Sequence, residues 1–248
     1  MLPAARAGEA DAQLYLWKTL TYCKDANHFY FEHGGQRLSL TEGLQWATAR
    51  NLPLSEPQEV YGKCHDFLDH SGSGLGDPSN WLAKATAAGQ PIAQAVTASK
   101  ALMQAYMLRQ TQAAGVPLPM PEDPTLRGVA PVSLLRAAVQ SLDPEVLFII
   151  GDSSLLLFPE STEANIEGTA WKLVACERGL DCTANGAWVK ASCAYDPQCA
   201  APVTSTDFIR RLAGDDWVAV QQRAAEINSR LVAGDWDELG FGPSSQAN

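Results

Sequence analysis

The sequence predicts an all-α protein. Helix start signals and apolar residues at helical spacing recur along most of the 248 residues, whereas the alternating pattern of strands is almost absent. The hydrophobic fraction of 46% and the charged fraction of 19% are those of a globular chain, so the helices are expected to pack into a core. An even number of cysteines, six, adds the expectation of covalent links between them.

In the first half of the chain, most expected helices have a recognisable start. Ser39 and Glu42 form a capping box, in which each side chain bonds the other residue's backbone amide. Asp77 and Pro78 supply an N-cap and a first-turn proline, and Gly89 ends that helix. Together with the apolar spacing, these signals predict helices over 9–23, 39–50, 55–68, 78–88 and 91–110.

Five prolines between residues 112 and 131 predict an extended linker or surface loop, because proline fixes φ and removes a backbone donor. Beyond it, helices are expected over 132–142, 144–158, 163–178, 186–194, 205–213 and 215–233, with a short turn over 236–241. The run 146–150 has the composition of a strand but no partner strand, so it is predicted to be helical. The expected organisation is a helical region over 1–111, the linker, a second helical region over 132–241, and a flexible tail over 242–248.

The charge of the chain restricts its partners. A formal net charge of -10 and a pI near 4.8 disfavour nucleic acid, because a phosphate backbone would be repelled. The longest apolar run, from Val146 to Phe158, contains Gly151 to Ser154, so the sequence predicts no membrane span. We expect no cofactor, and the favoured partner is a protein.

The cysteines are expected to form disulfides. Zinc sites prefer C-x2-C spacing, whereas the C-terminal cluster contains two C-x5-C pairs, so a metal cluster is the less favoured alternative. Cys23 and Cys64 pair by default. Two pairings of the cluster stay open: a nested hairpin, or a local pairing within each C-x5-C segment. The cluster comprises Cys176, Cys182, Cys193 and Cys199.

Disulfides predict an oxidising location, the bacterial periplasm or the cell exterior. Residues 1–8 lack the basic start and the apolar stretch of an export signal. The sequence is therefore interpreted as the mature part of an exported protein after removal of its signal.

Two short segments, Ala7–Gln13 and Ala88–Gln94, echo each other, each with a glycine between two expected helices. The longer stretch from Trp81 to Ala98 resembles the Sel1-like repeat, a tetratricopeptide-like pair of antiparallel helices. This resemblance implies helix hairpins in a right-handed array that serves protein-protein contacts. A diverged unit would have to lie between the two echoes. The C-terminal half matches no Sel1 pattern and is similar to uncharacterised exported bacterial proteins.

No catalytic or metal site is predicted. The segment from Phe148 to Ser153 resembles the nucleophile block of GDSL-type esterases, but those enzymes need a histidine near the C-terminus, and the last histidine here is His70. The cluster of His65, Asp66, Asp69 and His70 is interpreted as a solvated helix face rather than a metal site.

A single catalytic glutamate, as in helical lytic transglycosylases that cleave peptidoglycan, is the enzymatic alternative. The glutamates that could fill this catalytic role are each better explained as residues that interact favourably with the dipole at a helix N-terminus. They are Glu42, Glu56, Glu145 and Glu163.

Three consecutive aromatic residues, Phe29, Tyr30 and Phe31, lie in a glycine-containing segment over 27–35. They are the candidate binding loop, although packing beneath a link between Cys23 and Cys64 is at least as good an explanation. The sequence thus favours a non-enzymatic binding or scaffolding module. The alternatives are a single-glutamate peptidoglycan hydrolase and an immunity or inhibitor protein for a secreted toxin, the latter by analogy alone.

Overall fold

A computed structural model describes residues 1–33, 36–49, 58, 61–64, 75–114, 123–157, 163–183, 186–189 and 206–242. The described residues are predominantly helical, as expected, and they divide into two compact units, Met1–Ala88 and Gly89–Asn248. This division differs from the expected organisation because the helix over 91–110 belongs to the second unit, where it packs against the two helices that follow it. The expected boundary lay after residue 111.

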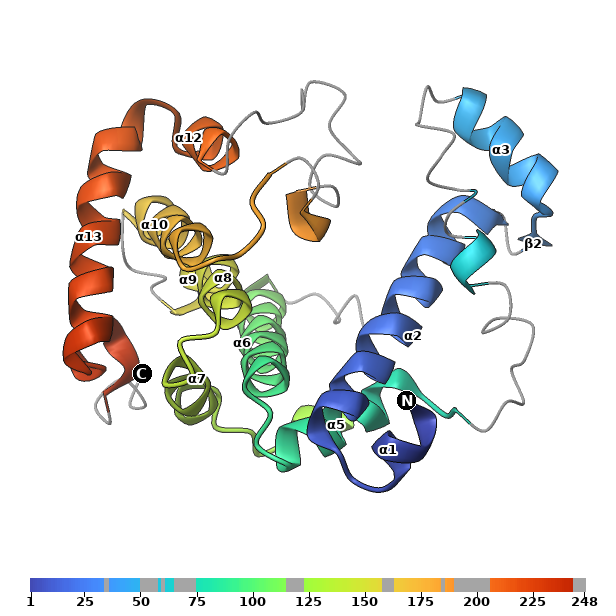
Figure 1. Cartoon of the computed structure of the whole chain (residues 1–248), viewed down its shortest axis with the longest axis horizontal. Helices are drawn as coiled ribbons and strands as arrows, with labels where there is room; N and C mark the ends of the chain where they lie inside the picture. The colour runs from blue at the N-terminus through green and yellow to red at the C-terminus, as the bar shows by residue number, and fades with distance from the viewer. Residues whose placement is uncertain are drawn as a thin grey trace. The chain divides into compact units, whose positions relative to one another are not determined.

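The N-terminal unit is organised around one long helix. Helix α2 (Ala10–Phe31) packs against α1 (Leu2–Arg6) and α5 (Pro78–Ala87) (Figure 1). A hairpin of two short strands, each of two residues, follows α2. The hairpin pairs β1 (Glu32–His33) with β2 (Gln36–Arg37) and leads into α3 (Leu40–Ala49). The core of this unit gathers the buried side chains of Ala5, Ala12, Leu16 and Trp81.

Helix α2 continues beyond the expected end at residue 23. The first glycines after Cys23 are Gly34 and Gly35, and no proline intervenes, so no helix-breaking residue lies in the extension. Cys23 is buried in α2 and is joined to Cys64 by a disulfide, as predicted. The bond holds the helical residues 61–64 against α2.

Both predicted N-terminal caps are confirmed. The Asp77 side chain accepts a hydrogen bond of 2.8 Å from the amide of Ser79, and Pro78 occupies the first turn of α5. At α3, the amide and the hydroxyl of Ser39 donate to the Glu42 carboxylate at 2.8 and 2.7 Å. The Glu42 amide in turn lies 3.4 Å from the Ser39 hydroxyl, which completes the capping box.

This capping box predicts a pH dependence for α3. The pKa of Glu42 is lowered from 4.5, first by the hydrogen bond from the Ser39 amide and then by that from its hydroxyl. A lowered pKa means that the stabilisation is present above the unfolded value of 4.5 and is lost as the pH falls through the folded value. NMR titration should therefore give Glu42 a pKa below 4.5, and the Ser39→Ala variant should raise it. An unchanged pKa in the variant would contradict this account.

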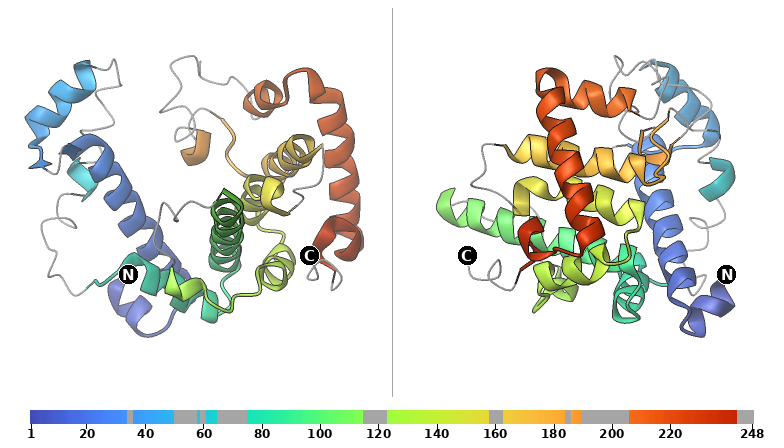
Figure 2. Two further views of the ribbon diagram at one scale, coloured as in Figure 1. Left: turned by 180° about the vertical axis from the view of Figure 1, so that it is seen from behind. Right: turned by 60° about the vertical axis from the view of Figure 1, so that its left-hand side comes forward.

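The C-terminal unit stacks its helices around α10 (Ala164–Glu177). This helix packs against α8 (Pro144–Asp152) on one side and α13 (Trp217–Ala233) on another, and α6 (Pro91–Ala114) packs against α7 (Pro131–Val139) and α8 (Figure 2). Shorter elements complete it: η1 (Pro124–Leu126), α9 (Ser154–Leu157), α12 (Asp207–Ala213), η2 (Gly214–Asp216) and a π-helical turn, η3 (Asp237–Phe241).

Helices α8 and α10 approach closely because both carry glycine at their contact. A Cβ atom added to Gly168 would lie 2.7 Å from the carbonyl oxygen of Gly151, and one added to Gly151 would lie 2.7 Å from that of Gly168. Around this contact the core is filled by fully buried side chains from several helices. They include Leu135, Leu147, Ile150, Trp171, Ile209, Ile227 and Phe241.

The segment 146–150 is helical, as predicted, and forms the middle of α8. The expected helix over 144–158 is interrupted at Ser153, between α8 and α9. The expected linker over 112–131 is partly wrong: α6 continues to Ala114, and Pro131 begins α7, where its missing amide costs nothing. Residues 115–122 lie outside the described part. In the described chain, no helix combines the length and hydropathy that crossing a bilayer requires.

Candidate functional site

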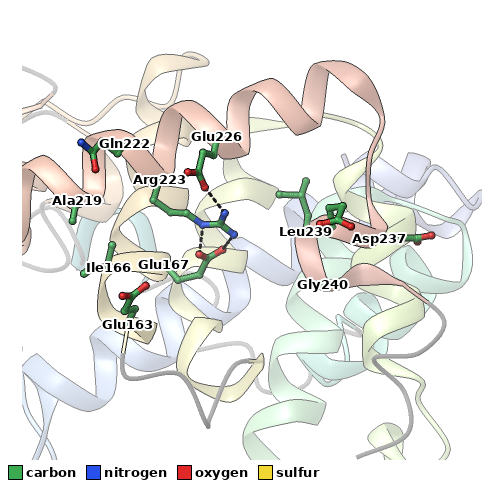
Figure 3. Close-up of a pocket in the computed structure, with 11 residues that line it drawn as sticks. Glu163, Ile166, Glu167, Ala219, Gln222, Arg223, Glu226, Asp237, Leu239 and Gly240 are labelled. Carbon is green, nitrogen blue, oxygen red and sulfur yellow. Dashed lines mark hydrogen bonds and ion pairs between the residues drawn. The ribbon is translucent and has the colours of Figure 1, made fainter.

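A cleft of about 650 Å³ lies in the C-terminal unit between the start of α10, the middle of α13 and the turn η3 (Figure 3). Apolar contacts come from Ile166, Ala219 and Leu239. Most of the remaining lining is charged, and carboxylates outnumber guanidinium groups. The charged residues that line it are Glu163, Glu167, Arg223, Glu226, Asp237 and Glu238.

The innermost feature is an ion pair between α10 and α13. Arg223 Nε lies 2.5 Å from Glu167 Oε2, and Arg223 Nη2 lies 3.1 Å from Glu167 Oε1, a two-point contact between planar groups. The indole Nε1 of Trp171, one turn along α10, donates to the same Oε1 at 2.9 Å. Only 12% of the Glu167 side chain is exposed, so this carboxylate is held by three donors at the back of the cleft.

Arg223 also contacts the outer part of the cleft, where its Nη1 lies 2.8 Å from Glu226 Oε2. The hydrogen bonds with Glu167 raise the pKa of Arg223, which burial alone would lower, and Glu226 adds to the rise. The guanidinium therefore stays charged and is fully engaged by two carboxylates.

The turn η3 forms the other end of the cleft. Arg136 on α7 binds Asp237 at 3.0 Å and donates to the carbonyl oxygen of Phe241 at 3.1 Å. Arg230 on α13 donates to the carbonyl oxygen of Glu238 at 2.7 Å and lies 3.4 Å from its carboxylate. Even with these two flanking arginines, five carboxylates face three guanidinium groups, so the cleft keeps an excess of negative charge.

The lining residues determine which chemistry is accessible. Among the residues that line the cleft there is no serine, cysteine, threonine, lysine, histidine or tyrosine, so its titratable groups are carboxylates and one guanidinium group. Three of its carboxylates are largely exposed: 59% of the side chain of Glu226, 62% of Asp237 and 66% of Glu238. The arrangement is suited to holding positively charged groups.

Comparisons with protein-family models, curated proteins and solved structures found no match. The geometry of the described residues therefore carries the functional argument.

The structure describes three of the four glutamates that the sequence offered as catalytic candidates. Glu163 borders the cleft, Glu145 lies in the first turn of α8, and Glu42 belongs to the capping box of α3. Glu56 and the segment 65–70, with both of its histidines, lie outside the described residues.

Ser153, the serine of the GDSL-like segment, is fully buried. Its hydroxyl lies 2.8 Å from that of Ser99 and 2.9 Å from the carbonyl oxygen of Ile149. A buried hydroxyl that is bonded in this way has no access to substrate, which agrees with the rejection of an esterase site here.

Residues 29–31 do not form a loop, which corrects the expectation of a candidate binding loop. Phe29, Tyr30 and Phe31 make the last turn of α2, because the helix runs on to the hairpin. Their proposed role in binding remains a prediction, and their side chains lie outside the described part.

The cysteine cluster uses the local pairing in the part that is described. Cys176, at the end of α10, is bonded to Cys182, with a Cα–Cα distance of 5.7 Å. Gly179 has φ +110° and reverses the chain between them, a conformation that favours glycine. The nested pairing of Cys176 with Cys199 is therefore wrong. Cys193 and Cys199 lie outside the described residues.

Sequence reasoning missed the central residues of the cleft. Glu167 and Trp171 carry a weak signal, because residues four apart share one face of a helix. Arg223 lies 56 residues further along the chain, so nothing local connects it to Glu167.

Proposed function

We propose that this protein is a non-enzymatic binding module whose C-terminal cleft holds a positively charged segment of a partner protein. The observation that carries the proposal is the cleft of about 650 Å³, in which carboxylates exceed guanidinium groups and the central Arg223 is already neutralised. An incoming lysine or arginine would meet the exposed carboxylates of Glu226, Asp237 and Glu238.

The charge of the whole chain supports the same partner. With a net charge of -10, the protein attracts cationic segments over roughly one Debye length, about 8 to 10 Å at physiological salt. Long-range attraction raises the rate of encounter, while the cleft supplies the contacts that keep the partner bound.

The hydrolase with a single catalytic glutamate is the less favoured proposal. Such an enzyme needs a carboxyl group that can carry a proton to the bond it cleaves. Glu167, the most enclosed carboxylate of the cleft, accepts three hydrogen bonds from Arg223 and Trp171, so it is engaged in holding α10 against α13. An immunity or inhibitor role would be a special case of the favoured proposal, with a basic toxin as the partner.

The proposed setting is an oxidising compartment, either the periplasm or the cell exterior. Two disulfide bonds, Cys23–Cys64 and Cys176–Cys182, support it. We also retain the Sel1-like helix-hairpin array as a proposal. What supports it is that Gly8 and Gly89, the glycines of the two echoes, both adopt positive φ between consecutive helices.

The proposal is tested by titrating the protein with an octalysine peptide and following binding by calorimetry. In the Glu163→Gln, Glu226→Gln double variant we expect affinity to fall about 2- to 30-fold, because each of the two surface ion pairs contributes roughly 0.2–1 kcal/mol. Binding to the wild-type protein should also weaken as salt is raised.

The matched control removes the same charge from the N-terminal unit. Glu9 and Asp25 are exposed, and the Glu9→Gln, Asp25→Asn double variant should keep wild-type affinity for octalysine. If both double variants weaken binding equally, the attraction comes from net charge alone and the cleft is not the site.

A further inference from the structure

One carboxylate of the cleft is bound at two points by a guanidinium group, and that group comes from the protein itself. Both oxygens of Glu167 accept hydrogen bonds from Arg223, and one of them also accepts from Trp171. A fork of parallel N–H donors that matches the two oxygens of one carboxylate is the strongest contact that an arginine makes with an acid. At Glu167 this contact is already occupied (Figure 3).

The three most exposed carboxylates of the cleft are each bonded at one oxygen by an arginine of the protein. Among the residues that the structure describes, the second oxygens of these carboxylates have no partner. Each carboxylate therefore offers an incoming group one oxygen instead of two. The pairs are Glu226 Oε2 with Arg223 Nη1 at 2.8 Å, Asp237 Oδ1 with Arg136 Nη1 at 3.0 Å, and Glu238 Oε2 with Arg230 Nη1 at 3.4 Å.

Guanidinium and ammonium groups differ in what they need from such oxygens. A guanidinium gains most from two oxygens of one carboxylate, whereas an ammonium is a compact point charge whose three donors can each take a single oxygen. Asp237 and Glu238 are neighbours in η3, and Arg230 holds Glu238 against α13 one turn beyond Glu226. The accessible oxygens thus belong to different carboxylates, an arrangement that suits an ammonium group.

We propose that the end of the cleft formed by Glu226, Asp237 and Glu238 selects ammonium groups, so that the segment it binds carries lysine instead of arginine there. This inference rests on the proposed function and names the chemistry of the partner. Glu163 does not belong to this end, because Figure 3 shows it across the Arg223–Glu167 pair from Asp237. The expected preference is opposite to the general one, since arginine is usually the stronger partner of a carboxylate.

Calorimetric titration with octalysine and with octaarginine, which carry the same charge, tests the proposal. We expect octalysine to bind about 3- to 10-fold more tightly, the range that corresponds to one net hydrogen bond. Equal affinity, or tighter binding of octaarginine, would overturn the proposal. Octaornithine carries the ammonium group on a shorter stem and should bind like octalysine. If it binds like octaarginine instead, the stem and not the charged group sets the preference, and the proposal is wrong.

The Arg230→Gln variant tests the cause of the preference. It frees the second oxygen of Glu238, so octaarginine should gain more affinity than octalysine and the preference should narrow to less than about 2-fold. Arg109→Gln is the matched control: it removes the same charge from an exposed residue of α6 outside the cleft lining, and it should leave the preference unchanged. Equal narrowing in both variants would show that net charge sets the preference, against the proposal.

Circular dichroism checks the folding of Arg230→Gln, because Arg230 also binds the carbonyl oxygen of Glu238. The comparison of the three peptides on the wild-type protein does not depend on this variant.

The Glu163→Gln, Glu226→Gln variant separates this inference from the proposed function. If it weakens the binding of both peptides but wild-type protein binds octaarginine at least as tightly as octalysine, the cleft holds cations without selecting ammonium groups. Only the present inference then fails. If the double variant weakens neither peptide, the cleft is not the binding site and both proposals fail.

Discussion

Replacing Cys23 and Cys64 together by alanine is expected to lower the free energy of unfolding of the N-terminal unit by about 4 kcal/mol. The bond closes a loop of 41 residues, and a cross-link stabilises mainly by restricting the unfolded chain, more so for longer loops. Both cysteines are buried, and alanine is apolar, so the double substitution introduces no buried polar group that would lack a hydrogen-bond partner. Urea unfolding followed by circular dichroism measures the effect.

The second disulfide provides the matched comparison. Cys176 and Cys182 are six residues apart, and the same loop-closure argument gives only about 2 kcal/mol for their double alanine variant. A loss at Cys176–Cys182 as large as that at Cys23–Cys64 would show that packing around the sulfur atoms, rather than loop closure, sets the stabilisation.

The Gly168→Ala substitution is expected to destabilise the C-terminal unit by about 3 kcal/mol, because an overpacked core must shift its backbone to make room. The new methyl group would meet the Gly151 carbonyl oxygen at 2.7 Å and would also overlap the Ser154 hydroxyl. A backbone carbonyl in α8 cannot turn away as a flexible side chain can, so α8 and α10 would have to separate. Thermal or urea unfolding of the variant measures the loss.

Gly62→Ala is the control for this prediction. Nothing lies within 4 Å of a Cβ added at Gly62, which is exposed in the helical residues 61–64. Alanine there should be neutral or stabilising by up to about 1 kcal/mol, since glycine is the weaker helix former. If Gly168→Ala were equally harmless, the close contact of α8 with α10 would not be required for stability.

Local sequence signals predicted the local structure well. The caps at Ser39 and Asp77 and the helical state of residues 146–150 were all predictable, because the interacting groups lie within a few residues of one another. One local prediction was wrong. The aromatic residues 29–31 were expected in a loop, yet they belong to the last turn of α2.

Only the structure decided which cysteine is bonded to Cys176. Spacing allowed a local and a nested arrangement, and the turn at Gly179 brings Cys182, rather than Cys199, to the end of α10. The prediction for Cys23 and Cys64 succeeded by elimination, since these two cysteines lie far from the cluster.

The sequence by itself determined that this chain is helical and acidic and that it has six cysteines, and it determined where several of its helices begin. Only the tertiary structure decided that Glu167 and Arg223, 56 residues apart, meet at the back of one cleft. The physical reason is that caps and helical periodicity depend on neighbours within one or two turns. The contact of α10 with α13 depends instead on how buried faces fit together, and no short segment encodes that fit.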